Sequence, residues 1–274
     1  MFNNLPHLGV GLGYRSPLHR EIARNPGKIQ FLELVTDQFL YTPEDKLSAF
    51  LDSVRDFPLI PHSVAMSVGA DMPLDFDYLR RNATFVERTS APWFSDHLCF
   101  TKVAGVDLGQ LTPLSFDEET VEVVCRNVAA VKRTCDRPFL LENITYYFAL
   151  GSGEMTESQF ITKVLQKSDC GLLLDLNNVY LNSINIGYDP YQFLRELPLD
   201  RAVQVHLAGF ETEDGMLIDT HAAPVSKEVW ELLKFVCAKA DVRGILLERD
   251  ENLDDFGSIL EELDIARDIL RRFH

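Results

Sequence analysis

The chain has 274 residues, of which 46% are hydrophobic and 25% are charged, as in an ordinary globular protein. This composition excludes an intrinsically disordered or collagen-like chain, and the length fits a single α/β barrel domain. The chain carries 26 basic and 42 acidic residues, a formal net charge of −16. Such a field repels phosphate backbones, so we expect no nucleic-acid partner.

The location of the protein is predicted from features that the sequence lacks. No apolar run reaches the roughly 18 residues of a membrane span. The first residues show no basic start followed by an apolar stretch and a cleavage site. The five cysteines are scattered and form no CxxC pair. We therefore expect a cytoplasmic protein with reduced cysteines and no membrane partner.

Short apolar runs recur along the chain and are typical of strands buried on both faces, as in parallel sheets. There are eight of them: 7–14, 29–35, 58–64, 93–100, 139–144, 171–179, 202–209 and 244–250.

Most segments between these runs have helical patterns, namely 16–26, 42–54, 115–135, 156–167, 189–197, 226–240 and 263–273. Ser16 and Thr42 are candidate caps of the first two, with Pro43 at the first helical position. Strands alternating with helices predict a (β/α)8 TIM barrel in a single domain, residues 1–274. A doubly wound open sheet is the alternative. The first run disfavours it, because its glycines do not form the G-x-G-x-x-G loop that binds dinucleotides.

Histidines and acidic residues gather at the ends of the predicted strands, the side that carries the active site of such barrels. These residues are His62, His97, Glu142, Asp175, His206 and Glu248, with Asp219 and His221 in the loop after the seventh run. Burying so many polar groups costs several kcal/mol for each unpaired charge. Metal ions would supply the missing positive charge, so we predict that these eight residues bind metal.

Imidazoles and carboxylates without a thiolate suit iron, manganese or zinc. Four histidines and four carboxylates exceed the needs of one ion, so two or three ions bridged by carboxylates such as Glu142 or Glu248 are expected. Asn177 and Asn178 could form a turn or position a substrate or ligand. Arg15 is a candidate for holding an anionic group of the substrate. Glu33 is expected either behind a ligand or in a strand-end salt bridge.

Seven segments together resemble one family over nearly the whole chain. They are GVGLGYR, SDHLCF, LLENITYY, LLLDLNNVYLNSINIGYDP, VHLAGF, LIDTHAAPV and LLERD. The chain is identified by them as similar to the DUF692 family, the multinuclear non-heme iron-dependent oxidative enzymes. The resemblance implies a TIM barrel with two or three irons (Fe2+/Fe3+) and O2 as co-substrate. It implies oxidation of a cysteine in a ribosomally synthesised peptide.

The family's metal ligands fall on the same eight residues that the strand ends selected. Asn178 matches an asparagine at or near the metals, and Asp250 matches an aspartate near the reacting centre, here a candidate catalytic residue. The segment ELVTDQF at 33–39 departs from the family's EVHAENY pattern, which puts the substrate in doubt more than the metal site. The resemblance also implies a cysteine-containing precursor peptide and a small partner protein that holds its leader.

Two other functions remain open. A divalent-metal hydrolase or isomerase of the xylose-isomerase or endonuclease-IV-like barrel type would also place His, Asp and Glu at strand ends. The negative charge argues against the nuclease, and no lysine stands at a strand end for an isomerase. A non-enzymatic metal-binding protein is the other alternative. Iron content together with oxygen consumption would separate the oxidative enzyme from both.

Overall fold

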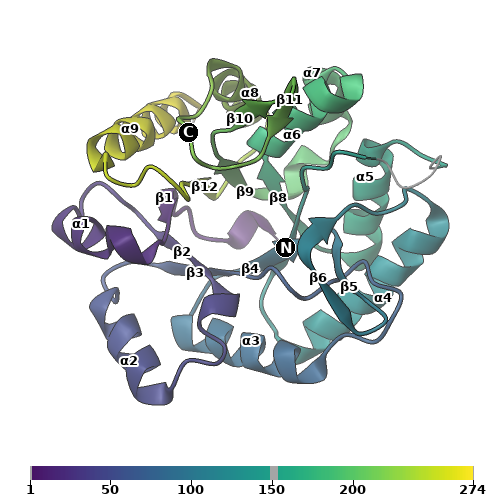
Figure 1. Cartoon of the computed structure of the whole chain (residues 1–274), viewed down its shortest axis with the longest axis horizontal. Helices are drawn as coiled ribbons and strands as arrows, with labels where there is room; N and C mark the ends of the chain where they lie inside the picture. Colours follow the sequence, from purple (N-terminus) through teal and green to yellow (C-terminus); the bar gives the residue numbers. More distant parts are fainter. Residues whose placement is uncertain (1, 149–153, 274) are drawn as a thin grey trace.

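Eight parallel strands close into a barrel in the computed structural model, which describes residues 2–148 and 154–273 (Figure 1). The strand order is β1-β12-β9-β8-β7-β4-β3-β2, and β1 pairs with both β2 and β12. The strands are β1 Gly9–Gly13, β2 Leu32–Val35, β3 Leu59–His62, β4 Phe94–His97, β7 Phe139–Glu142, β8 Gly171–Asp175, β9 Ala202–Leu207 and β12 Gly244–Leu247. Each lies within one of the eight apolar runs, so the TIM barrel prediction is confirmed.

Helices surround the barrel, as Figure 1 shows. They are α1 His19–Arg24, α2 Glu44–Ser53, α3 Phe76–Thr89, α4 Glu118–Thr134, α5 Glu157–Ser168, α6 Leu176–Asn182, α7 Pro190–Glu196, α8 Lys227–Cys237 and α9 Phe256–Phe273. Seven correspond to the predicted segments. Helix α3 was not predicted, although Asp75 caps it by accepting from the backbone N–H groups of Asp77 and Tyr78.

Two predicted helix caps are wrong. Ser16 lies in a 3-10 turn, Ser16–Leu18, and no side chain caps that turn or α1. Helix α2 begins at Glu44 with Pro43 in the cap position, and the Thr42 hydroxyl instead donates to the Gln38 carbonyl. The sixth apolar run also divides, because the strand ends at Asp175 and α6 begins at once.

The barrel interior consists of an apolar layer with a polar layer above it. Phe2, Phe31, Ile60, Trp93, Leu140, Leu173, Val203 and Leu246 form one buried cluster, separate from the core under the helices. Six polar residues each lie two positions after a member of this cluster: Glu33, His62, Ser95, Glu142, Asp175 and Glu248. Because alternate residues of a strand share a face, these polar side chains point into the barrel nearer its carboxyl end.

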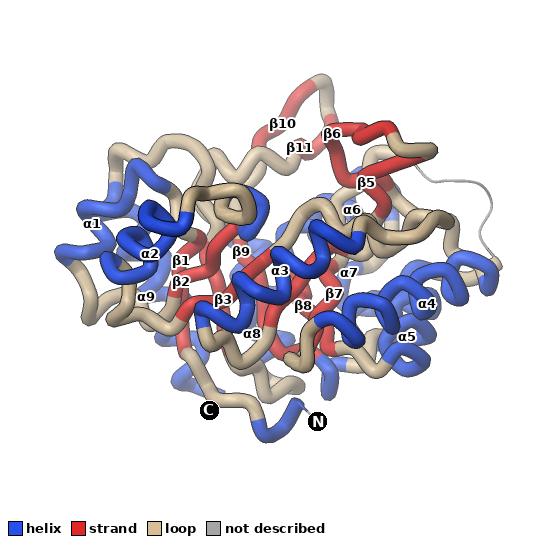
Figure 2. The backbone as a smooth tube through the Cα atoms, turned by 90° about the horizontal axis from the view of Figure 1, so that it is seen from below, coloured by secondary structure: helices blue, strands red, loops and turns tan. Residues whose placement is uncertain are grey.

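Two β-hairpins stand at that end of the barrel. Strands β5 Phe100–Val103 and β6 Val106–Thr112 follow β4, and β10 Glu211–Glu213 and β11 Met216–Ile218 follow β9. Figure 2 shows both hairpins at the end opposite to the chain termini. Among the described residues, no helix is long and apolar enough to span a bilayer.

Candidate metal centre

Six of the eight expected ligands meet at the carboxyl end of the barrel strands, in two groups. The first contains His62, His97 and Glu142, and the second contains Glu142, Asp175, His206 and Glu248. Within each group the candidate ligand atoms lie within 4.8 Å of one another, and every residue is buried. Glu142 belongs to both groups, so the two form one continuous centre.

The Glu142 carboxylate stands between histidines on its two sides. Its Oε2 lies 3.3 Å from His62 Nε2 and 3.4 Å from His97 Nε2, and its Oε1 lies 3.1 Å from His206 Nδ1. Two ligand atoms that each bind one ion at about 2.1 Å are themselves roughly 3.0–3.4 Å apart at angles of about 90–109°. This spacing fits metal ligation by Glu142 together with the three histidines.

Two of the histidines are held from behind. His206 Nδ1 faces the centre and lies 3.2 Å from Glu248 Oε2, while its Nε2 lies 3.1 Å from Glu33 Oε2. His62 Nε2 faces the centre, while its Nδ1 lies 2.8 Å from the Ser95 hydroxyl. Of the two roles open for Glu33, the structure has it behind a candidate ligand. Contacts of this kind fix the ring orientation of metal-binding histidines.

The strand-to-helix junction after β8 positions Asp175. Its Oδ1 accepts from the backbone N–H of Asn178 at 2.6 Å, which caps α6. The Asn143 side chain bonds both backbone groups of Asp175 at 2.9 Å. The Asn178 amide donates to the Asn143 carbonyl at 3.0 Å and accepts from Thr145. Asn178 therefore holds this frame with both polar atoms of its side chain, and Asp175 Oδ2 is left for the centre.

The other predicted residues form a hydrogen-bonded series beside the second group, here called the rim chain: Arg15, Asp250, His221, Asp219 and Asn177. His221 lies 2.9 Å from Asp219 and 3.0 Å from Asp250. Arg15 donates to Asp250, and Asn177 donates to Asp219 at 2.8 Å. His221 Nδ1 is 3.9 Å from Glu248 Oε2. Asp219 and His221 thus adjoin the second group through Glu248 and belong to neither compact group.

Asp250 and Arg15 neutralise each other in the rim chain. One oxygen of Asp250 accepts from Arg15 and the other contacts His221. Burial would raise the pKa of Asp250, but the hydrogen bond to His221 and the Arg15 guanidinium lower it below its usual value. Arg15 Nη2 also lies 3.8 Å from Glu248 Oε1. The guanidinium therefore compensates two carboxylates of the site.

The centre brings together three buried carboxylates, those of Glu142, Asp175 and Glu248, and their charges shift the pKa values of the groups among them. Burial, followed by Glu142 and Asp219, raises the pKa of Asp175 well above its usual value. Although burial lowers the pKa of His206, Glu33, Glu142 and Glu248 raise it well above its usual value. Burial is thus the main cause of the Asp175 shift, whereas nearby buried carboxylates, which favour the charged imidazole, cause the His206 shift.

Unsatisfied polar atoms concentrate at the same place. Nine buried side-chain N or O atoms of the described residues have no hydrogen-bond partner, and five belong to this centre or to Asn177 beside it. These five are His97 Nδ1, Glu142 Oε2, Asp175 Oδ2, Asn177 Oδ1 and His206 Nδ1. Such atoms are rare in native proteins unless an ion or water satisfies them. The donor set therefore fits metal ions.

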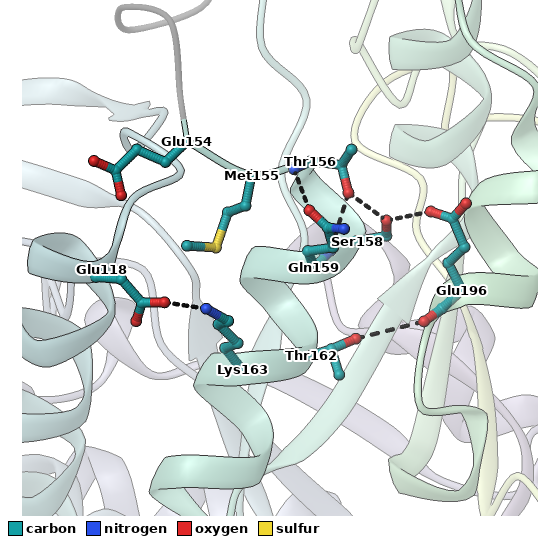
Figure 3. A pocket seen from close by; sticks show the side chains of 9 residues that line it. All are labelled: Glu118, Glu154, Met155, Thr156, Ser158, Gln159, Thr162, Lys163 and Glu196. Atoms are coloured by element: carbon teal, nitrogen blue, oxygen red, sulfur yellow. Dashed lines mark hydrogen bonds and ion pairs between the residues drawn. The ribbon is translucent and has the colours of Figure 1, made fainter.

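A surface pocket of about 710 Å³ lies elsewhere, at the start of α5 (Figure 3). It shares no residue with the metal centre. Lys163 points to Glu118, and Ser158 points to Glu196, so these polar groups satisfy one another. The pocket has no histidine and no unpaired cation among its lining residues.

Sequence analysis missed three residues that support the centre, Ser95, Gln204 and Asn143. Ser95 and Gln204 each precede a predicted ligand by two residues and so share its face of the strand. The period of two along the strand was a usable signal for both. Asn143 acts through the backbone of a neighbouring strand, for which no local pattern exists.

Comparisons with known proteins show the family to which the chain belongs. Residues 9–271 match the family model described as "RiPP precursor modification enzyme MbnB/TglH/ChrH". A UPF0276 protein of Caulobacter vibrioides is 37% identical over 264 residues, covering 96% of this chain and 94% of the relative. A UPF0276 protein of Pseudomonas aeruginosa is 35% identical over 266 residues, covering 96% and 93%.

Solved structures with the same fold include two sugar epimerases. D-psicose 3-epimerase, crystallised in the presence of D-fructose, has a TM-score of 0.59 at 10% identity and covers 96% of this chain and 97% of its own. The 3-keto-D-glucoside 4-epimerase from E. coli has a TM-score of 0.62 at 10% identity and covers 95% and 99%. At this identity the likeness concerns the fold alone.

Proposed function

Because this chain belongs to the RiPP precursor modification enzyme family MbnB/TglH/ChrH, we propose that it oxidises a cysteine residue of a ribosomally synthesised precursor peptide. The reaction uses O2 and two or three iron ions at the end of the barrel. The shared position of Glu142 between two ligand groups carries this proposal, because the two groups would hold two ions side by side.

The proposed ligands divide between the ions. His62 and His97 would hold one ion with Glu142, and Asp175, His206 and Glu248 would hold a second. Asp219 and His221 are assigned to a third ion beside Glu248. Iron, when bound, would supply the redox chemistry with O2 and would lower the pKa of a substrate thiol.

The rim chain receives the peptide. Arg15 stands at one end of this series and is the proposed substrate contact. Asn177, proposed from the sequence for the same role, is fully buried at the other end and donates to Asp219, so it would act on the peptide through Asp219. The side chain of Asp250 is 41% exposed, against 22% or less for Arg15, Asp219 and His221. We therefore assign Asp250 as the catalytic residue that the substrate reaches. A small leader-binding protein is proposed to present the precursor peptide.

The first test is the metal content of protein purified without oxygen from cells grown with iron. Two or three irons per chain, with oxygen consumed in the presence of a cysteine-containing precursor peptide, support the oxidase. One or two zinc or manganese ions without iron uptake support the hydrolase or isomerase instead.

Ligand variants test the site. His97→Ala and Glu142→Ala should each lower the iron content and abolish peptide oxidation, measured by the mass of the peptide. His19→Ala is the matched control, because His19 lies on α1 and contacts Tyr14. Full iron content and turnover in both ligand variants would refute the assignment.

A further inference from the structure

Behind His206, three buried side chains form a hydrogen-bonded series that crosses the barrel. Trp93 Nε1 donates to Gln204 Oε1 at 2.7 Å, and Gln204 Nε2 donates to Glu33 Oε2. Glu33 Oε2 then lies 3.1 Å from His206 Nε2. None of the four residues is more than 2% exposed, so water cannot replace these partners.

The series joins strands that are not neighbours in the sheet. Glu33 lies on β2, Trp93 directly precedes β4, and Gln204 and His206 lie on β9. Neither β2 nor β4 pairs with β9, whose neighbours are β8 and β12. The contacts therefore cross the barrel interior and do not depend on backbone hydrogen bonds between paired strands.

The direction of each hydrogen bond follows from Trp93. An indole N–H can only donate, so the Gln204 amide must present its oxygen to Trp93 and its nitrogen to Glu33. The amide nitrogen carries two hydrogens, and it also lies 3.0 Å from His206 Nε2. An ionised carboxylate only accepts. Glu33 is thus the group beside His206 Nε2 that can accept a proton from it.

A metal ion binds the neutral imidazole of His206, and the neutral ring has two tautomers. With the proton on Nε2, His206 donates to Glu33, and the lone pair on Nδ1 faces Glu142 and Glu248. Without the Glu33 carboxylate, Nε2 would instead accept from the Gln204 amide. The proton would then sit on Nδ1, where it blocks a metal ion.

We infer that Glu33, oriented by Gln204 and Trp93, is a positioning residue that keeps the His206 proton on Nε2 so that Nδ1 can bind metal. The inference rests on the proposed metal centre, but it depends neither on the metal being iron nor on the reaction. It assigns a task to three side chains that bind no ion themselves.

The test is an anaerobic titration with ferrous iron against a competing chelator, followed by the absorption spectrum of the cobalt-substituted protein. Glu33→Gln keeps the size of the side chain and removes the carboxylate. It should weaken one iron site by about 10- to 100-fold and change the cobalt spectrum. Glu33→Asp keeps a carboxylate, so its iron affinity should lie between those of Glu33→Gln and the unchanged protein.

Trp93→Phe tests whether Trp93 sets the orientation of the Gln204 amide, because without the indole N–H that amide is free to rotate. A loss of less than about tenfold is expected, since Glu33 itself remains. Trp230→Phe is the control, because Trp230 is the other tryptophan and lies on α8, outside the series. It should leave the affinity and the spectrum unchanged.

Unchanged affinity and cobalt spectrum in folded Glu33→Gln would overturn the inference. If that variant does not fold, unchanged binding in Trp93→Phe together with Gln204→Met overturns it equally. Weakened zinc or manganese binding in Glu33→Gln, with no iron bound by the unchanged protein, would support the inference and refute the proposed iron chemistry. Intact iron binding and peptide oxidation in Glu33→Gln would refute the inference alone.

Discussion

Replacing Asp175 by asparagine should stabilise the metal-free protein while weakening metal binding. Asp175 has two separate tasks: Oδ1 caps α6, and Oδ2 is buried without a partner near Glu142. Asparagine is as good a helix cap as aspartate. Its amide nitrogen can donate to a neighbouring carboxylate, which Asp175 can do only in its protonated form. One substitution therefore separates the structural task from the metal-binding one.

The size of each effect follows from the site. A buried polar atom without a partner costs about 1–3 kcal/mol, and we expect about 1 kcal/mol of this to be recovered. In a domain of this length that raises the melting temperature by roughly 2–4 °C. Loss of one anionic ligand from a buried charge cluster costs about 3–5 kcal/mol, which is at least about a 100-fold loss of iron affinity.

The assay is a thermal melt in excess chelator, paired with an anaerobic iron titration. Asp117→Asn is the matched control, because Asp117 caps α4 by accepting from the Thr120 N–H and lies outside the centre. That variant should change neither the stability of the metal-free protein nor the free energy of iron binding by more than about 0.5 kcal/mol. A lower melting temperature for metal-free Asp175→Asn, or unchanged iron affinity, would refute the reasoning.

Two further outcomes are expected. Burial and nearby carboxylates raise the pKa of Asp175, and carboxylates outweigh burial to raise the pKa of His206 and His221. The folded metal-free protein then holds more protons than the unfolded chain, so its melting temperature should fall between about pH 7 and pH 9. The difference in melting temperature between the iron-loaded and the metal-free protein should widen over the same range. A melting temperature of the metal-free protein that stays constant or rises with pH contradicts this. Separately, Arg249 donates to Glu262 in a buried pair, so Glu262→Leu should cost about 3–5 kcal/mol in urea unfolding. The double variant Arg249→Met/Glu262→Leu should recover part of the loss, because the Val225 N–H that also donates to Glu262 stays unpaired. No recovery in the double variant would show that the cost does not come from the unpaired arginine.

The polar layer of the barrel could be predicted because local pattern and barrel geometry agree. His62, Glu142 and Glu248 each end a continuous apolar run, and parallel strands bring their carboxyl ends to one face. Local pattern was less informative for helices. Helix α3 follows a long loop without a predicted cap, and α6 continues directly from an apolar strand, so the two merged into one run.

The function of individual polar residues could not be predicted in the same way. Asn178 follows Asp175 closely in sequence, yet its amide holds the loop after β7. Asp219 and His221 are two residues apart, and they form ion pairs in the rim chain outside both compact groups. Such assignments depend on where a loop folds back, which local sequence does not specify.

The sequence by itself determined the eight strands, their alternation with helices and the kinds of side chain at the strand ends. These depend on short-range periodicity and on the need to bury apolar faces. Only the tertiary structure decided that Glu142 stands between two ligand groups and that Glu33, Gln204 and Trp93 meet behind His206. The reason is physical: barrel closure brings together strands far apart in the chain, and their relative stagger decides which side chains share a level.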